Sequence, residues 1–301
     1  MNKKQILTLA TAVLVCLAAL FAVLPLQTAT KDAGAWMADL EDERRINTIA
    51  IPGTHDSGAT HSIADLAGKC QSLTIDEQLD LGVRFFDVRL KLNNNELSVV
   101  HSFVDQGTGF DEVLFDMVEY LTENPSEFLV ISIKEDASPS NSDVDFTAKL
   151  EQTLRACALV STETSLPETV GEARGRIHVI SRYSGSTLGV PAYEGWADST
   201  SFSLGELYVQ DHYKVSDADT KIADIETALS VGASGEYALV LNFASCYYPD
   251  VLIPPTYAGL PAHTINGWMV ENLPEREIAG VILCDFITSE LCEIIIGGNF
   301  R

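Results

Sequence analysis

Short apolar runs alternate with longer segments of helical periodicity along the chain after Trp36. Eight of these runs, each four to seven residues long, show little alternation between apolar and polar positions. Such runs predict strands that are covered on both faces, as in a parallel sheet. The predicted strands are residues 48–51, 83–88, 97–100, 128–133, 177–180, 206–209, 237–243 and 280–286.

Helix signals lie between these runs. Thr74 and Glu77 have the spacing of a capping box at the start of a predicted helix, 74–81. In 110–122 the apolar side chains fall on one helical face, and an Asn-Pro pair then ends the helix. Because strands and helices alternate without a break in composition, the sequence predicts one α/β domain, a single irregular (β/α)8 TIM barrel. Further helices are predicted at 146–159, 216–230 and 266–271.

The first 35 residues differ from the rest of the chain. Lys3-Lys4 precedes an uncharged stretch at 6–26, and Ala33-Gly34-Ala35 offers a small-x-small cleavage site, a pattern typical of an export signal. The uncharged stretch has 21 residues, enough to span a bilayer, so an uncleaved anchor remains an alternative. We expect 1–35 to be a signal peptide or an N-terminal membrane anchor and 36–301 to be the catalytic barrel of a secreted or extracytoplasmic protein.

The surface charge limits the partners. Without residues 1–35 the chain carries 16 basic and 42 acidic side chains, a net charge of −26. This balance argues against a nucleic-acid partner and against electrostatic docking on strongly anionic membranes.

The cysteines indicate no metal site. Five remain after residue 35, none in a C-x-x-C pair, and their odd number leaves at least one thiol unpaired or paired between chains. Cys284 and Cys292 lie in apolar runs and are predicted to fill the core, so no zinc site is expected.

The stretch TIAIPGTHDS at residues 48–57 carries the first candidate chemistry. The apolar run breaks at Pro52-Gly53, and His55 and Asp56 follow directly. Alone, this pair is equally consistent with a turn. Polar residues also follow the other seven runs, however, and the carboxyl ends of barrel strands meet at one rim. They are Asp87, Arg89, His101, Lys134, Arg182, Asp211, Tyr213, Asn242 and Asp285.

Two histidines and a fixed cation at one rim suit the cleavage of a phosphodiester. One histidine takes a proton from the nucleophile, the other donates one to the leaving oxygen, and the cation stabilises the charge on the phosphate. Neighbouring carboxylates fix the histidine tautomer and raise its basicity. The chain has no serine elbow, phosphate loop or paired-carboxylate metal motif.

Several motifs follow one another in a fixed order from about Trp36 to the C-terminus. They are IPGTHDSG at 51–58, LGVRFFDVRL at 81–90, His101, ISIKED at 131–136, ISRYSGS at 180–186, VQDHYKV at 209–215 and CDF at 284–286. This ordered set resembles the bacterial phosphatidylinositol-specific phospholipases C. The resemblance implies an irregular barrel that cleaves phosphatidylinositol to inositol 1,2-cyclic phosphate and diacylglycerol.

The resemblance also implies roles for individual residues. His55 would be the general base, oriented by Asp285, and His101 the general acid, assisted by Asp56. Arg89 would stabilise the pentacoordinate phosphorus. The substrate-binding residues would be Asp87, Lys134, Arg182, Asp211 and, stacking on the inositol ring, Tyr213. A structural role for Asp87, and rim ion pairs for Lys134 and Arg182, remain alternatives, and Asn242 is assigned no role.

No cofactor is expected. The calcium-dependent relatives carry Asn after the first histidine and acidic ligands around the phosphate, whereas this chain has Asp56 and Arg89. A fixed guanidinium can replace Ca²⁺ electrostatically, so the reaction is expected to be metal-independent. Two other function classes stay open. A glycerophosphodiester phosphodiesterase would need a Glu/Asp metal set that the first two strands do not supply, and a non-catalytic inositol-lipid binding module would not need both histidines.

The predicted membrane contact is the loop 247–260, which is rich in apolar and aromatic residues. Segment 59–72 has no tryptophan and offers only Ile63 and Leu66 to a membrane surface. Packing of loop 247–260 against the barrel is an equally open interpretation. We expect a peripheral, monomeric protein that acts on a phosphatidylinositol lipid, with interfacial binding that depends little on anionic lipid.

Overall fold

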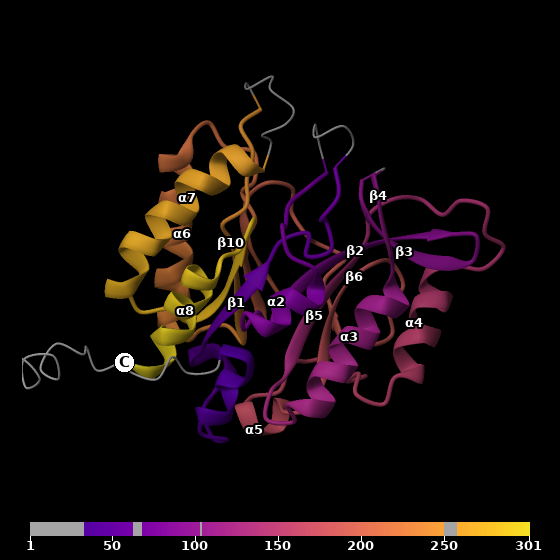
Figure 1. Ribbon diagram of the computed structural model, residues 1–301, viewed down its shortest axis with the longest axis horizontal. Helices are drawn as coiled ribbons and strands as arrows, with labels where there is room; N and C mark the ends of the chain where they lie inside the picture. The colour runs from indigo at the N-terminus through magenta and orange to yellow at the C-terminus, as the bar shows by residue number, and fades with distance from the viewer. Residues whose placement is uncertain (1–32, 63–67, 103, 250–257) are drawn as a thin grey trace, which may run out of the picture. The chain divides into compact units, whose positions relative to one another are not determined.

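The computed structural model describes residues 33–62, 68–102, 104–249 and 258–301 (Figure 1). The predicted apolar stretch 6–26 and most of the predicted signal segment lie outside the described residues. Within the described part of the chain, every helix is too short or too polar to cross a membrane.

One mixed sheet runs through the described part of the chain and curls into an open barrel. Its strand order is β7-β6-β5-β2-β1-β11-β10-β9-β8, with β3 and β4 added beyond β2. The strands are β1 (Ala50–Thr54), β2 (Phe85–Asn93), β3 (Glu96–His101), β4 (Val104–Gly109), β5 (Leu129–Glu135), β6 (Ile177–Arg182), β7 (Val190–Pro191), β8 (Ser201–Leu204), β9 (Leu207–Gln210), β10 (Leu239–Phe243) and β11 (Gly280–Cys284).

Helices cover the outside of this sheet. In Figure 1, α6, α7 and α8 lie beside β10, and α3 and α4 lie on the opposite side, beyond β5. The capping box predicted at Thr74 is present at the start of α2. The helices are α2 (Ile75–Asp80), α3 (Phe110–Glu123), α4 (Phe146–Ala156), α5 (Val170–Ala173), α6 (Ala218–Ser234), α7 (Gly259–Asn272) and α8 (Ser289–Gly297), with 3-10 turns at Ala33–Asp39, Ile46–Thr48, Leu273–Glu275 and Gly298–Phe300.

The predicted irregular barrel is confirmed. The barrel is irregular because it is open at one place, between β7 and β8. Each of the eight predicted strands overlaps an observed one. The strand path begins at β7 and ends at β8, and within the described ranges no ladder pairs these two strands, so the barrel is open between them. The short strands β4, β7 and β8 were not predicted, because β4 and β8 are polar and β7 has only two residues.

Two predictions about the strands need correction. The third predicted strand is β3, which does not join the parallel set but pairs antiparallel with β2 in a hairpin, Leu90 opposite Val99. Pro52-Gly53 does not end the first strand, which continues to Thr54. Proline lacks only the amide donor, and the carbonyl of Pro52 still accepts a hydrogen bond from the amide of Arg84 at 3.0 Å.

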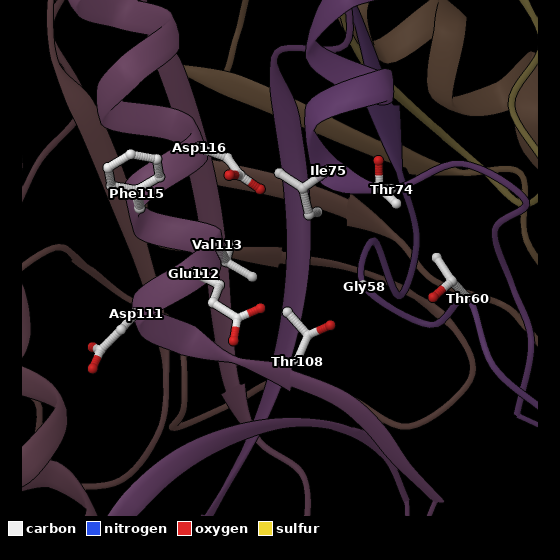
Figure 2. Close-up of a pocket in the computed structure, with 10 residues that line it drawn as sticks. All are labelled: Gly58, Thr60, Thr74, Ile75, Thr108, Asp111, Glu112, Val113, Phe115 and Asp116. Carbon is white, nitrogen blue, oxygen red and sulfur yellow. The ribbon is translucent and has the colours of Figure 1, made fainter.

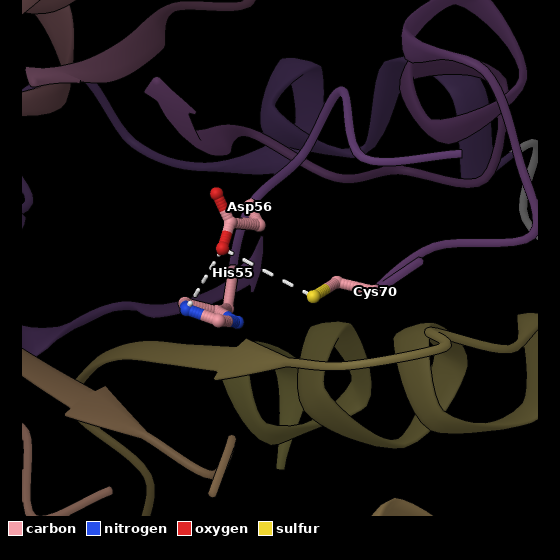
Figure 3. A group of neighbouring side chains, drawn as sticks. All are labelled: His55, Asp56 and Cys70. Atoms are coloured by element: carbon pink, nitrogen blue, oxygen red, sulfur yellow. Dashed lines mark hydrogen bonds and ion pairs between the residues drawn. The ribbon is translucent and has the colours of Figure 1, made fainter. Parts of the chain in front are cut away.

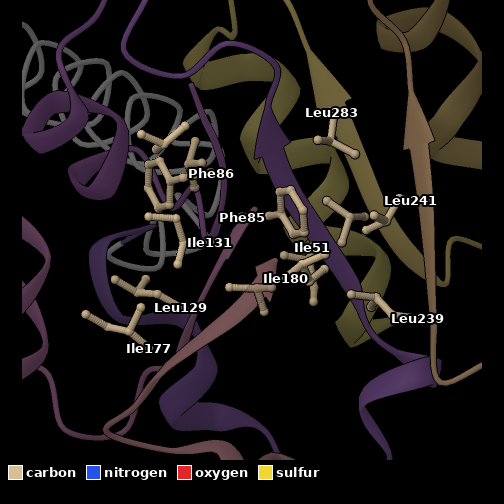
Figure 4. Packing of buried hydrophobic residues seen from close by; sticks show 14 of the residues in the cluster. Ile51, Phe85, Phe86, Leu129, Ile131, Ile177, Ile180, Leu239, Leu241 and Leu283 are labelled. Atoms are coloured by element: carbon tan, nitrogen blue, oxygen red, sulfur yellow. The ribbon is translucent and has the colours of Figure 1, made fainter. Parts of the chain in front are cut away.

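Strand alternation divides the core into two layers. In Figure 4, Phe85 lies with Ile51 and Ile180, near Leu241 and Leu283, whereas Phe86 lies with Ile131, away from them. Because successive side chains point to opposite faces of a strand, Phe85 faces the barrel interior and Phe86 the helices. All these side chains are fully buried or nearly so, which fixes the register of each strand at the rim.

Candidate active site

The interior layer continues at the carboxyl ends of the strands as a polar layer. Asp87 and Arg89 follow Phe85 at steps of two along β2, Arg182 follows Ile180, and Asp285 follows Leu283. Since the side-chain period of a strand is two, the residues that fill the barrel also dictate which polar side chains point into its mouth. The predicted rim site therefore follows from the packing of the core.

His101 reaches this rim by a different route from the one predicted. It ends β3, the antiparallel return of the β2 hairpin, so the ladder brings it back down to the level of Arg89. If β3 ran parallel to β2, as predicted, it would run in the opposite direction and would bring His101 to the rim from the other end of the barrel.

Two buried glutamines hold the loop that carries His55. The side-chain amide of Gln71 donates to the carbonyls of His55 and Cys284, each at 2.8 Å. Gln78 accepts from the Thr54 hydroxyl at 2.7 Å and donates to the carbonyl of Ser57 at 2.8 Å. Both glutamines are fully buried, so the loop after β1 is fixed before any ligand is present.

His55 lies between a carboxylate and a guanidinium. Its Nδ1 is 2.9 Å from Asp285 Oδ1, and its Nε2 is 2.8 Å from Arg89 Nη2. Asp285 accepts and Arg89 donates, so the neutral tautomer carries its proton on Nδ1 and exposes a lone pair on Nε2. Burial alone would lower the pKa of His55, but the charges of Asp285 and Asp56 outweigh it and raise the pKa above its ordinary value.

Asp56 connects both histidines with Arg89. Its Oδ1 lies 2.8 Å from Arg89 Nε, and its Oδ2 lies 3.4 Å from Nε2 of His55 and 3.4 Å from Nε2 of His101. Asp56 is buried and has φ of +44°, a left-handed conformation that aspartate tolerates better than most residues. This turn of the backbone places the Asp56 carboxylate close to both histidines and to Arg89.

Arg89 is held by three carboxylates. Besides Asp56, its guanidinium lies 3.4 Å from Asp87 and 3.7 Å from Asp136. Burial disfavours its charged form, but these carboxylates outweigh burial and raise the pKa of Arg89 well above its ordinary value. A permanent positive charge therefore stands beside Nε2 of His55.

Asp87 and Arg182 extend the network along the rim. Arg182 Nη1 lies 3.1 Å from Asp87 Oδ1, and the guanidinium stacks 3.6 Å above the ring of Trp196. The Trp196 indole donates to Asp211 at 3.1 Å. Burial would raise the pKa of Asp87, but Arg89 and Arg182 hold it well below its usual range. Trp196 was not predicted, because it lies in a long loop between two unpredicted strands.

Asp136 is the second site residue that sequence reasoning missed. It lies one residue beyond β5 and accepts from Lys134 Nζ at 2.6 Å and from the Ser102 amide at 2.6 Å. Lys134 therefore joins the network through Asp136. The ISIKED motif contains Asp136, so its place directly after a strand end was a usable signal.

Tyr213 lies apart from this network. Its hydroxyl donates to Asp198 at 2.6 Å, Lys214 binds the same carboxylate at 2.8 Å, and its ring packs against Tyr247. Among the contacts of the described residues, none joins Tyr213 to His55 or Arg89. The structure thus brings the other nine predicted site residues into one connected network but not Tyr213. The predicted membrane loop 247–260 lies mostly outside the described residues.

Other polar residues have structural partners. His178 is buried and contacts the Ala173 carbonyl at 3.1 Å, and His212 pairs with Asp224 of α6 at 2.8 Å. Asn242 bonds to Gln210 and to the Ile225 carbonyl, on the helix side of β10. A cavity of about 450 Å³ lies beside the start of α3. Figure 2 shows its lining, which consists of threonine, acidic and apolar residues, none from the network.

The fold and the site together define a class of protein. It is a barrel with two histidines at its mouth, both beside the Asp56 carboxylate, and a permanently charged guanidinium that contacts Nε2 of His55. This set can take a proton, return a proton and stabilise an anion, which is what cleavage of a phosphodiester requires.

Comparison with known proteins places the chain more narrowly. Residues 42–160 match the family model PI-PLC X 1. The chain is 29% identical over 245 residues to a 1-phosphatidylinositol phosphodiesterase of Staphylococcus aureus, covering 72% of this chain and 76% of that protein. It is 22% identical over 278 residues to the protein of that name from Listeria monocytogenes, covering 88% and 84%.

Solved structures agree with these matches. A double mutant of the phosphatidylinositol-specific phospholipase C from S. aureus matches with a TM-score of 0.78 and 25% identity, over 90% of this chain and 98% of that one. The L. monocytogenes enzyme matches in fold with a TM-score of 0.71 and 21% identity, over 89% and 99%. The resemblance to the bacterial phosphatidylinositol-specific phospholipases C is confirmed.

Proposed function

We propose that this protein is a metal-independent phosphatidylinositol-specific phospholipase C that releases diacylglycerol and inositol 1,2-cyclic phosphate. The observation that carries the proposal is His55, whose Nδ1 faces Asp285 at 2.9 Å while its Nε2 faces Arg89 at 2.8 Å. The contact of Nδ1 with Asp285 fixes the orientation of the ring, and Nε2 keeps a lone pair beside the fixed positive charge of Arg89.

His55 acts as the general base. The 2-hydroxyl of inositol replaces Arg89 Nη2 as the partner of Nε2, and its proton passes to Nε2 as the oxygen attacks phosphorus. Asp285 stabilises the imidazolium that forms, because it already accepts the Nδ1 proton. The raised pKa of His55 favours this transfer.

Arg89 and His101 act on the other side of the phosphorus. The guanidinium stabilises the charge that develops on the phosphoryl oxygens. His101 donates a proton to the diacylglycerol oxygen as its bond to phosphorus breaks, and Asp56, 3.4 Å from its Nε2, assists. His55 then releases its proton to solvent and His101 takes one up from solvent, so that both histidines return to their starting protonation states.

The remaining rim residues bind the inositol ring. Arg182, Asp211 and Lys134 bind its hydroxyls, and Asp87 holds Arg89 and Arg182 in place. The rigid contact of Arg182 with Trp196 and Asp87 supports a pre-formed pocket rather than one built by the substrate.

The ion pairs of Arg89 support a reaction without metal. Three carboxylates of the kind that would bind Ca²⁺ — Asp56, Asp87 and Asp136 — already neutralise this guanidinium. A bound cation would have to displace it, and the guanidinium offers the same electrostatic help at the phosphate.

The purified protein is therefore expected to convert phosphatidylinositol to cyclic inositol phosphate in excess EDTA. ³¹P NMR detects this product directly. Loss of turnover in EDTA with recovery in Ca²⁺ would contradict metal independence and favour a metal-dependent phosphodiesterase. Binding of phosphatidylinositol vesicles without any turnover would instead identify a lipid-binding module.

The setting of the reaction is a lipid surface outside the cytoplasm. The basic start and apolar stretch 6–26 support export, with or without retention as an anchor. A monomer that reaches the membrane with loop 247–260 is the arrangement that we propose, since the sequence of this loop is rich in apolar and aromatic residues.

Replacing Asp285 by asparagine should change the pH profile in a defined direction. His55 works as a base only when neutral, so kcat/KM rises with pH through the raised pKa of His55. Asp285 makes the largest charge contribution to that rise, so the acid limb of the Asp285→Asn profile should move to lower pH. Because the ring also loses its orientation, the plateau should fall on the order of 10²–10⁴-fold.

A matched control is Asp224→Asn, which alters the equivalent His-Asp pair at His212 outside the site. Its pH profile should overlay that of the unmodified protein. An Asp285→Asn profile with an unmoved acid limb would show that Asp285 does not set the basicity of His55.

A further inference from the structure

The thiol of Cys70 lies inside the catalytic network without a part in the proposed reaction. Its Sγ is 4.0 Å from Asp56 Oδ2 and 4.0 Å from His101 Nδ1, and the residue is 2% exposed. The backbone fixes its position, because its amide donates to Ala59 at 2.8 Å and its carbonyl accepts from Phe286 at 2.8 Å. The sulfur therefore has a fixed position within the site.

Cys70, Asp56 and His55 together offer a sulfur, an oxygen and a nitrogen to one point. One ligand atom from each lies within 4.8 Å of the other two, and Figure 3 shows the carboxylate of Asp56 between the imidazole and the sulfur. Metal–ligand bonds of about 2.0–2.3 Å in a tetrahedral site place neighbouring ligand atoms about 3.3–3.6 Å apart. The 3.4 Å between Asp56 and His55 fits this range, and the 4.0 Å to Cys70 needs only a small approach of the sulfur.

We propose that Cys70, Asp56 and His55 form an inhibitory site for a thiophilic divalent cation such as Zn²⁺ or Cd²⁺. The cation takes the lone pair on Nε2 of His55 and displaces Arg89 from it. The thiol proton passes to solvent as the metal–sulfur bond forms. The inhibitory consequence rests on the proposed function, since it removes the general base of that reaction.

The donor set selects the metal. Ca²⁺ and Mg²⁺ require several oxygen ligands, whereas a thiolate, an imidazole and one carboxylate are the ligands that Zn²⁺ and Cd²⁺ accept. His101 lies next to this group, with its Nε2 3.4 Å from the same oxygen of Asp56.

Metal binding releases a proton from the site. The metal displaces the proton of the Cys70 thiol as the sulfur binds, as it does at other thiolate sites. Until a cation binds, Arg89 Nη2 stays 2.8 Å from Nε2 of His55.

Direct binding tests the site without substrate. Titration of the purified full-length protein with Cd²⁺ should produce an ultraviolet thiolate-to-cadmium charge-transfer band, lost in both Cys70→Ala and Cys70→Ser. Two substitutions of Cys70 are used so that a folding defect in one does not decide the result, and near-ultraviolet circular dichroism verifies the fold of each variant. Cys157→Ser removes a more accessible thiol and should keep the band. A band of unchanged strength in the Cys70 variants overturns the proposal.

Inhibition tests the consequence. With phosphatidylinositol as substrate, the Zn²⁺ concentration for half-inhibition should rise at least about tenfold in Cys70→Ala, relative to the activity of each variant in EDTA, and stay unchanged in Cys157→Ser. Equal inhibition of Cys70→Ala and the unmodified protein would overturn the proposal. If the cadmium band behaves as expected but no variant cleaves phosphatidylinositol, the metal site stands and the proposed function fails.

Discussion

Replacing His55 by alanine is expected to lower kcat/KM for phosphatidylinositol by about 10⁴-fold, the upper end of what general acid–base catalysis contributes. The substitution removes the group that accepts the hydroxyl proton and leaves Asp285 buried without its partner. It leaves the loop itself in place, because Gln71 and Gln78 hold the backbone there. Release of cyclic inositol phosphate, followed by ³¹P NMR, measures the effect.

His212→Ala is the matched control for this experiment. His212 is also half-buried and also pairs with an aspartate, but it belongs to the contact with α6. Its replacement should leave kcat/KM within about threefold of the unmodified protein, since surface changes away from the site alter little. A His55→Ala protein that keeps more than a tenth of the activity would exclude His55 as the base.

The barrel was predictable because a parallel sheet buried on both faces requires apolar runs without alternation. β5 is buried along most of its length and β11 along all of it, and both are recognisable in the sequence as apolar runs. The direction of β3 was not predictable in this way. The turn Asn93-Asn94-Asn95 favoured a hairpin, yet the run at 97–100 is also consistent with a parallel strand.

The main site residues were predictable because position on a strand determines direction. Once Phe85 faces the interior, Asp87 and Arg89 must face the mouth. Trp196 was missed for a physical reason: it acts through Arg182, a partner distant in sequence, rather than through a motif of its own. Asp136, in contrast, lies in the ISIKED motif directly after a strand end. Cysteine spacing cannot reveal Cys70, whose partners Asp56 and His101 meet it only in the folded chain.

Replacing Arg89 by lysine is expected to lower kcat by about 10²–10³-fold, the cost of losing one donor to the charge of a transition state. Lysine keeps the positive charge that Asp56 and Asp87 need, so the fold is spared the cost of unpaired buried carboxylates. The ammonium cannot span these carboxylates and the phosphoryl oxygen at once, as the planar guanidinium can. KM should change less than kcat, because the lost contact forms chiefly in the transition state.

The control is Arg155→Lys, an exposed arginine paired with Glu151 on α4, which should leave both constants unchanged. A chemical test separates geometry from charge. Guanidinium ion added to an Arg89→Ala protein should restore part of the lost kcat, whereas ammonium ion should not, because only a planar fork pairs with two oxygens at once. Arg89→Lys with kcat within threefold of the unmodified protein would show that any positive charge suffices. In that case a bound metal ion would serve as well, and the argument for a metal-independent reaction would lose its basis.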